Sequence, residues 1–211
     1  MVSKKQIAIL LSKLSVFEKP SAKQEQYTTD SEVAAEMLWQ AYMLGDIKDK
    51  VIADLGCGTG LLGIGCLLLE AKKVYFVDVD KEALKMLDKN LQFVEEEFDM
   101  DLKGKVEIMN IDVSKFDKKV DTVVQNPPFG VQKEHADKVF LEKAFEVGQI
   151  IYTLHKPESK EFVDKICKNN NCQVTNYCQY SFPLKATMPF HKHKIQRIQV
   201  GCWRITKAGD E

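Results

Sequence analysis

The stretch Asp54-Leu55-Gly56-Cys57-Gly58-Thr59-Gly60 joins the apolar run Val51–Leu55 to a second apolar run, Leu61–Leu69. A short aliphatic run that ends in closely spaced glycines and leads into a longer apolar run predicts a strand, a tight turn and a helix. An open α/β sheet binds its ligand where a strand ends and its helix begins, and glycine lets the ligand approach the backbone closely. The stretch therefore predicts an α/β fold with a ligand site at residues 54–60.

The spacing of these glycines distinguishes between kinds of ligand. A dinucleotide-binding loop has Gly or Ala three residues after its second glycine, and Leu61 occupies that position. A Walker-type phosphate loop needs Gly-Lys followed by Ser or Thr, whereas Gly63 is followed by Ile64. What remains is an acidic residue, Asp54, two positions before a G-x-G-x-G run, which is typical of loops that hold S-adenosylmethionine. Asp54, Gly56 and Gly58 are therefore candidate cofactor-binding residues.

Acidic residues follow the next two predicted strands. Asp78 comes 22 residues after Gly56, at the end of a strand, where a carboxylate can accept hydrogen bonds from two ribose hydroxyls. Asp80 is expected to cap the helix that begins at Lys81. Asp112 follows the third strand at the same edge of the sheet and could meet an adenine amino group, but from sequence it could equally be a turn residue.

Strand-like and helix-like runs alternate beyond residue 50, which predicts a parallel sheet built from βαβ units. The final two runs have no helix between them and are expected to pair antiparallel. The predicted strands are Val51–Leu55, Val74–Val77, Val106–Met109, Val120–Val124, Ile150–Leu154, Gln173–Ser181 and Ile195–Ile205, and the predicted helices are Val2–Leu14, Ser31–Leu44, Leu61–Leu69, Lys81–Phe93, Ala136–Val147 and Pro157–Cys167. The expected fold is a Rossmann-like, seven-stranded, mostly parallel sheet with an antiparallel last strand and two N-terminal helices.

The composition is that of an ordinary globular protein. With 211 residues, 45% of them hydrophobic and 29% charged, the chain is expected to form one domain and is not of a disordered or fibrous class. We interpret 1–49 as N-terminal helices with a lid and 50–211 as the α/β core. No apolar run is long enough to cross a membrane, and six dispersed cysteines are expected to stay thiols, so we expect a cytoplasmic protein. The intervals between Cys167, Cys172 and Cys178 fit no common zinc-ligand spacing, and no metal is expected.

The charge is unevenly distributed along the chain. The formal net charge is -1, but residues 165–209 contain eight Lys and Arg residues and no Asp or Glu. Such a segment indicates a surface that faces a polyanion, with a solvated basic face as the alternative. Within it, Phe190, Lys192 and Lys194 are the candidate substrate contacts, because the last two strands should project this segment at the carboxyl edge of the sheet.

Asn126-Pro127-Pro128-Phe129 follows the fourth strand and is the most specific motif. Each proline ring fixes φ, and Pro128 also pushes Pro127 into an extended conformation, so the loop holds Asn126 and Phe129 at fixed points. An amino group conjugated to an aromatic ring or a carbonyl is a poor nucleophile because its lone pair is delocalised. The Asn126 side-chain oxygen and the Pro127 carbonyl can bind its two hydrogens and favour the pyramidal nitrogen that attacks a sulfonium methyl. Phe129 can stack on the flat substrate.

These motifs resemble those of an amino-group methyltransferase with the seven-stranded Rossmann-like fold. The further motifs Phe17-Glu18-Lys19-Pro20, Glu25-Gln26-Tyr27, Leu154-His155-Lys156 and Phe190-His191-Lys192 resemble the methyltransferase-like protein five family over nearly the whole chain. The resemblance implies N6-methylation of an adenosine in small-subunit ribosomal RNA, S-adenosylmethionine as cofactor and a small zinc-binding activator protein as partner. It also implies two sets of cofactor contacts: Gln26 and Thr29 in a lid, and Gly56, Thr59, Leu61, Asp78, Asp112 and Val113 around the site. Thr28 stands where eukaryotic relatives have Pro.

Three other functions share some of these features. A glutamine-N5 methyltransferase uses similar chemistry, but such enzymes resemble Asn-Pro-Pro-Tyr and carry an additional amino-terminal helical domain. A DNA adenine methyltransferase uses the same loop, and sequence alone does not reveal what would read a ribose 2′-hydroxyl. A non-catalytic RNA-binding assembly factor is the third alternative, which the intact Asn126 and glycine loop oppose.

Overall fold

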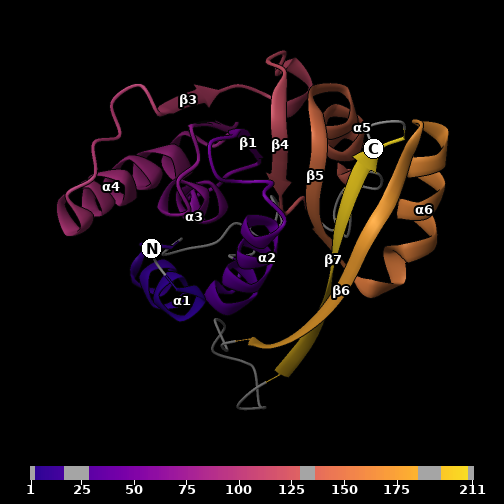
Figure 1. The fold of residues 1–211 in the computed structure, drawn as a ribbon, viewed down its shortest axis with the longest axis horizontal. Helices are drawn as coiled ribbons and strands as arrows, with labels where there is room; N and C mark the ends of the chain where they lie inside the picture. The colour runs from indigo at the N-terminus through magenta and orange to yellow at the C-terminus, as the bar shows by residue number, and fades with distance from the viewer. Residues whose placement is uncertain (1–2, 17–28, 129–135, 185–195, 209–211) are drawn as a thin grey trace.

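The fold is a seven-stranded sheet with helices on both faces (Figure 1). The computed structural model describes residues 3–16, 29–128, 136–184 and 196–208. The strands are β1 (Val51–Leu55), β2 (Lys73–Asp78), β3 (Val106–Asn110), β4 (Val120–Gln125), β5 (Gly148–His155), β6 (Cys172–Leu184) and β7 (Gln196–Lys207), in the order β3-β2-β1-β4-β5-β7-β6. The strands β1 to β5 pair in parallel, and β7 is antiparallel to both β5 and β6. The predicted fold class, with its antiparallel last strand, is confirmed.

The helices follow the apolar periodicity of the sequence closely. They are α1 (Lys4–Lys13), α2 (Ser31–Met43), α3 (Leu61–Leu68), α4 (Lys81–Phe98), α5 (Ala136–Val147) and α6 (Lys160–Asn169), with short 3₁₀ turns η2 (Val113–Lys115) and η3 (Pro157–Ser159). Two predictions needed correction. Helix α4 continues five residues past Phe93, and the segment expected to start a helix at Pro157 begins as η3, because apolar periodicity does not distinguish a first 3₁₀ turn from an α-turn.

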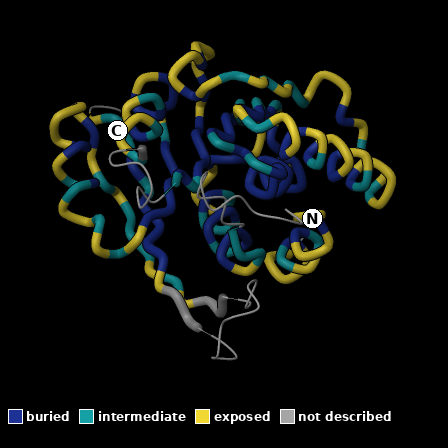
Figure 2. Tube along the Cα trace, turned by 180° about the vertical axis from the view of Figure 1, so that it is seen from behind, coloured by how far each residue is buried: buried dark blue, intermediate teal, exposed yellow. Residues whose placement is uncertain are grey.

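Side chains from the two faces of the sheet form two apolar cores, and Figure 2 shows the buried segments gathered along the sheet between exposed helix surfaces. One core lies between the sheet and the helices α1 to α4, and the other lies under α5 and α6. Because strand side chains alternate between faces, Ile52 enters the first core and Ala53 the second. Helices α1 and α2 contribute to the same core as α3 and so pack on the same face of the sheet. The division of the chain into N-terminal helices and an α/β core at residue 49 stays a prediction.

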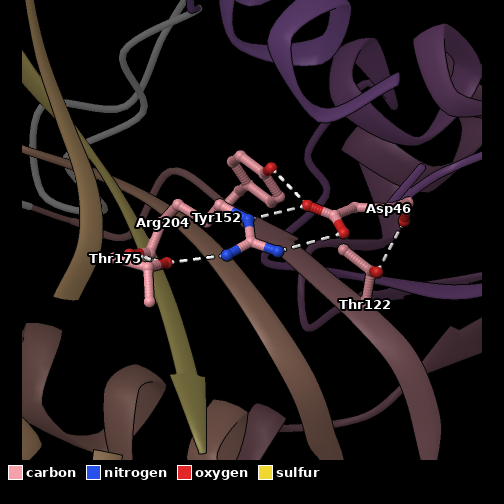
Figure 3. Close-up of polar contacts among 5 residues, drawn as sticks. All are labelled: Asp46, Thr122, Tyr152, Thr175 and Arg204. Atoms are coloured by element: carbon pink, nitrogen blue, oxygen red, sulfur yellow. Dashed lines mark hydrogen bonds and ion pairs between the residues drawn. The ribbon is translucent and has the colours of Figure 1, made fainter. Parts of the chain in front are cut away.

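A buried polar cluster fixes the carboxyl end of α2 to the sheet (Figure 3). The Asp46 carboxylate, 3% exposed, accepts hydrogen bonds from Arg204 Nε at 2.8 Å and Nη2 at 3.2 Å. It also accepts the Tyr152 hydroxyl at 2.6 Å, and the Asp46 carbonyl accepts the Thr122 hydroxyl at 2.6 Å. Thr175 accepts Arg204 Nη1 at 2.7 Å. The segment after α2 is thus bound directly to three strands, β4, β5 and β7, and through Arg204 to β6.

In the described part of the chain, no helix combines the length and the apolar character that crossing a bilayer requires.

Candidate active site

The loop after β1 makes a tight turn that places its backbone at the carboxyl edge of the sheet. Gly56 has φ +70°, and a Cβ there would lie 2.7 Å from Phe140 Cε1, so only glycine fits without movement of the ring. The amides of Gly56 and Cys57 donate to the Val77 carbonyl of β2 at 2.8 and 3.0 Å. Helix α3 starts directly after Gly60. The strand, glycine turn and helix predicted from the sequence are all present.

Asp54 lies behind this loop and supports it. Its side chain is 1% exposed, and Oδ2 accepts the Gly63 amide in the first turn of α3 at 2.8 Å. Burial raises the pKa of this carboxyl to about 7, and the hydrogen bond from Gly63 opposes that shift. The contact that the structure shows for Asp54 is with α3 and fixes where the glycine loop meets the helix, whereas its place among the cofactor-binding residues stays a prediction.

Asp78 connects the glycine loop to the next turn. Its Oδ2 accepts the Gly58 amide at 2.8 Å and its Oδ1 accepts the Asp80 amide at 2.8 Å. The carboxylate is partly buried, and this burial raises its pKa against the lowering effect of the two amides. Asp80 caps α4 by accepting the Glu82 amide at 2.8 Å, as predicted. The cofactor candidates Gly58 and Asp78 thus lie in direct contact.

The third acidic candidate begins the turn η2. Asp112 Oδ1 accepts the Ser114 amide at 2.9 Å and the Ser114 hydroxyl at 2.6 Å. Its neighbour Val113 is 6% exposed and packs in the core under α5 and α6. Asp112 is therefore the N-cap of η2, as a turn residue would be, and its contact with the adenine amino group stays a prediction.

Asn126 follows β4 and makes a contact across the site. Its Nδ2 donates to the Thr29 hydroxyl at 2.8 Å, although 97 residues separate the two in sequence. Its Oδ1 is buried and has no hydrogen-bond partner among the described residues. Leaving a buried acceptor unpaired costs about 1 to 3 kcal/mol, so such an atom needs an explanation. A hydrogen-bond donor on a bound substrate, directed at Oδ1, is one such explanation.

A second polar row lies on the opposite face of the same strand ends. Gln125 Nε2 donates to the Thr153 hydroxyl at 3.1 Å, and that hydroxyl lies 2.8 Å from His155 Nε2. All three side chains are buried. Burial lowers the pKa of His155 to about 3, so the imidazole is neutral at physiological pH. These contacts join the carboxyl ends of β4 and β5, and Gln125 immediately precedes the Asn-Pro-Pro loop in the chain.

The two buried titratable groups give a prediction for the ligand-free protein. The raised pKa of Asp54 means that its contribution to stability is complete below its ordinary pKa of 3.8 and is lost as pH rises through about 7. The lowered pKa of His155 means that its contribution is complete above 6.5 and is lost as pH falls toward 3. Between pH 7 and pH 5 the two changes oppose each other at about 2 kcal/mol each, and they nearly cancel.

Single variants separate these two contributions. The quantity to compare is the change in unfolding free energy when the pH is lowered from 7 to 5. For Asp54→Asn this change should be about 2 kcal/mol lower than for the wild type, and for His155→Gln it should be about 2 kcal/mol higher. Urea unfolding at three pH values measures both, and each variant serves as the control for the other. Wild-type pH dependence in both variants would contradict the assignment.

The structure brings most of the predicted site residues to one edge of the sheet and leaves some untested. The following predicted residues lie at or next to the carboxyl ends of β1, β2, β3 and β4: Asp54, Gly56, Gly58, Thr59, Leu61, Asp78, Asp112, Val113, Asn126, Pro127, Pro128 and Thr29. Gln26, Phe129, Phe190, Lys192 and Lys194 lie outside the described residues.

Asn90 is a site-supporting residue that the sequence interpretation missed. This buried residue of α4 donates from Nδ2 to the Thr59 carbonyl at 2.9 Å and to the Ser15 carbonyl at 3.0 Å, and its Oδ1 accepts the Ser15 amide at 2.8 Å. It therefore ties the glycine loop to the segment that follows α1. The available signal was a polar residue on the apolar face of α4, beside Leu87 and Leu91.

One of the eight basic residues in 165–209 does not contribute to a basic surface. Arg204 is paired with the buried Asp46, and its side chain is 17% exposed. The expectation that this stretch forms a polyanion-facing surface is thus corrected for Arg204, because its charge is neutralised inside the protein. Lys165 and Lys168, by contrast, are exposed on α6.

Comparison with known proteins places this arrangement in a class. The methyltransferase small domain family model matches residues 28–149. The crystal structure of a Pyrococcus horikoshii protein superposes with a TM-score of 0.87, at 43% identity over 99% of this chain and all of that one. The magnesium protoporphyrin IX methyltransferase of Synechocystis, solved with bound S-adenosylmethionine, shares the fold with a TM-score of 0.63 at 16% identity. The fold and the family model define a Rossmann-like methyltransferase domain.

Full-length relatives narrow the class. An uncharacterised protein of Methanocaldococcus jannaschii is 38% identical over 100% of this chain and 97% of its own length. The rRNA N(6)-adenosine-methyltransferase METTL5 of Danio rerio is 32% identical over 96% of this chain and 98% of its own length. The chain therefore belongs to the methyltransferase small domain family and, within it, to the methyltransferase-like protein five family that its motifs resemble.

Proposed function

We propose that this protein is an S-adenosylmethionine-dependent methyltransferase that acts on N6 of an adenosine in RNA, namely small-subunit ribosomal RNA. The observation that carries the proposal is the Asn126 amide, held by Thr29 with its Oδ1 buried and unpaired at the carboxyl edge of the sheet. The names of the Danio rerio, Drosophila melanogaster and Caenorhabditis elegans relatives as rRNA adenosine methyltransferases support the choice of substrate. The Pyrococcus horikoshii protein is described as a candidate RNA methyltransferase.

The residues at the carboxyl edge fit the proposed cofactor. The partly buried carboxylate of Asp78 suits two ribose hydroxyls, and the glycines of the loop, with φ +70° at Gly56 and +54° at Gly58, leave no Cβ between backbone and ligand. We assign Thr59, Leu61, Asp112 and Val113 to the rest of the same pocket, and Gln26 and Thr29 to its lid. When bound, S-adenosylmethionine supplies an electrophilic methyl group on a sulfonium.

The chain's own residues then act on the acceptor. The Asn126 Oδ1 and the Pro127 carbonyl accept the two hydrogens of the adenine amino group and draw its lone pair out of conjugation with the ring. Because nitrogen becomes acidic once it has four substituents, the departing proton needs no strong base. The neutral His155 and its partners Thr153 and Gln125 fix the strand ends below the loop.

Four remaining assignments extend this proposal. Phe129 would stack on the adenine, and Phe190, Lys192 and Lys194 would contact the RNA. A small zinc-binding activator protein would be the partner, and the cytoplasm the compartment. The resemblance implies the activator protein, the sequence itself suggests the other three assignments, and all four stay predictions.

A single comparison tests the proposal. Purified protein is incubated with methyl-labelled S-adenosylmethionine and, side by side, total ribosomal RNA, DNA and protein, followed by nucleoside analysis of the labelled product. Label in N6-methyladenosine of RNA supports the proposal. Label in DNA alone, or in a glutamine side chain, would assign the site to one of the alternative substrates, and no transfer to any substrate, with or without a cell extract that supplies activators, would indicate a binding protein.

Cofactor binding provides a separate prediction. Asp78→Ala is expected to weaken binding of S-adenosylmethionine by roughly 1.5 to 3 kcal/mol, because charge-assisted bonds to the ribose are lost. Titration calorimetry measures this, with Asp101→Ala as a control because Asp101 is an exposed acid in the loop after α4. Unchanged affinity in Asp78→Ala, or saturable binding of NAD in place of S-adenosylmethionine, would move the ribose site elsewhere.

A further inference from the structure

Thr29 makes its observed contact with Asn126, which the family resemblance does not suggest. Its hydroxyl accepts the Asn126 Nδ2 hydrogen bond at 2.8 Å. The resemblance assigns Thr29 to the cofactor lid, where it would touch the methyl donor. The contact in the structure instead joins it to the residue proposed to hold the methyl acceptor.

The position of Thr29 is fixed by the start of α2. The next residue, Asp30, is the N-cap of that helix, and its Oδ1 accepts the amides of Glu32 at 2.9 Å and Val33 at 3.3 Å. Val33 and Ala34 are buried in the core between the sheet and α1 to α4. The other end of α2 leads to Asp46, which is bound to the sheet through Arg204 and Tyr152 (Figure 3). The Thr29 hydroxyl is therefore carried by an element held at both ends.

In the structure this contact leaves the oxygen of the Asn126 amide available. The amide oxygen and nitrogen have nearly the same shape, so packing alone selects poorly between two orientations related by a half-turn. With Nδ2 bound to Thr29, Oδ1 is the atom left over, and it is buried without a partner among the described residues. The reverse orientation would point an NH₂ group at the amino group of the substrate, placing donor against donor.

We propose that Thr29 is a positioning residue for methyl transfer, which holds the Asn126 amide with its oxygen toward the substrate amino group. The inference rests on the proposed function, because it assigns Thr29 a task in that same site. It also means that the segment before α2 reports on the acceptor side of the reaction. Displacement of a reacting group by about 1 Å can cost on the order of 100-fold in rate.

Three variants test the inference. Thr29→Val keeps the branched shape but removes the hydroxyl, Thr29→Ser keeps the hydroxyl, and Ser31→Ala removes a neighbouring hydroxyl that is outside the proposed site. We expect Thr29→Val to lower kcat by about 10-fold to 100-fold when both cofactor and RNA are saturating. Thr29→Ser should restore kcat, and Ser31→Ala should match the wild type. Weaker cofactor binding with wild-type kcat at saturating cofactor would instead establish a lid contact and overturn the inference.

A second measurement does not depend on activity. The side-chain NH₂ signals of Asn126, assigned by their loss in Asn126→Ala, should shift in the amide NMR spectrum of Thr29→Val and return near their wild-type positions in Thr29→Ser. Signals that stay in place would overturn the inference even if the wild type methylates RNA. If the wild type transfers methyl groups to no RNA adenosine while the signals do shift, the contact stands and the proposed function fails.

Discussion

Asn126→Ala is expected to lower the rate of methyl transfer by about 100-fold or more while S-adenosylmethionine binds as it does to the wild type. The physical reason is that the lost oxygen, buried and unpaired in the structure, is proposed to face the acceptor amino group and not the donor. A group fixed in advance stabilises developing charge without reorganisation during the reaction. Single-turnover rates at saturating cofactor and RNA measure the effect on chemistry, and calorimetry measures cofactor affinity.

The control for this variant is Asn169→Ala, which removes an exposed asparagine from the end of α6. It should retain the wild-type rate. Because Asn126→Ala also frees the Thr29 hydroxyl, unfolding in urea should be compared to show that the variant is folded. A folded Asn126→Ala protein that turns over at the wild-type rate would remove Asn126 from the mechanism, and a parallel loss of cofactor affinity would place the amide on the donor side.

The elements that sequence predicts best are those whose burial follows one simple pattern. Val51–Leu55 and Ala136–Val147 have the bounds expected from their apolar residues. The end of α4 was missed because Glu95, Glu96 and Glu97 carry no apolar periodicity, yet they are good helix formers and continue the helix to Phe98. Local signals therefore predict which elements exist, whereas their polar ends depend on capping.

The site was predictable where its residues directly follow strands. The carboxyl ends of parallel strands lie along one edge of the sheet, so Asp78, Asp112 and Asn126 had to lie along that edge. The contacts of Thr29 with Asn126 and of Asn90 with Thr59 were not predictable, because they join segments 97 and 31 residues apart through single polar side chains. Nothing in the local pattern of either segment names its partner.

Arg204 illustrates the same limit for charge. In sequence it is one member of an acid-free stretch, and composition suggests that it faces solvent or a polyanion. In the structure Arg204 lies on β7 opposite Tyr152 of β5, on the face covered by α2. There it binds the carboxylate of Asp46, whose opposite charge offsets the free-energy cost of burying the guanidinium. Arg204 therefore holds the segment after the carboxyl end of α2, and Thr29 lies just before the amino end of the same helix.

Arg204→Met is accordingly expected to reduce the free energy of unfolding by about 3 kcal/mol, because it leaves the Asp46 carboxylate, 3% exposed, without its counter-charge. Methionine keeps most of the aliphatic volume, so the loss reports on charge and hydrogen bonding more than on packing. The measurement is the urea midpoint at constant slope. Arg204→Lys, which keeps the charge but not the paired geometry of the guanidinium, should fall between Arg204→Met and the wild type.

The matched control removes a charge from an ion pair in solvent. Lys85 and Glu82 on α4 are 2.8 Å apart with side chains 69% and 77% exposed, so Lys85→Met should change stability by about 1 kcal/mol or less. If Arg204→Met costs no more than Lys85→Met, the Asp46 carboxylate is reached by water and the pair does not anchor α2. If it costs about 3 kcal/mol and the Asn126 side-chain NH₂ signals also shift, the carboxyl end of α2 and the acceptor amide near its start are coupled through the helix. That coupling would connect an internal ion pair to a residue of the proposed site.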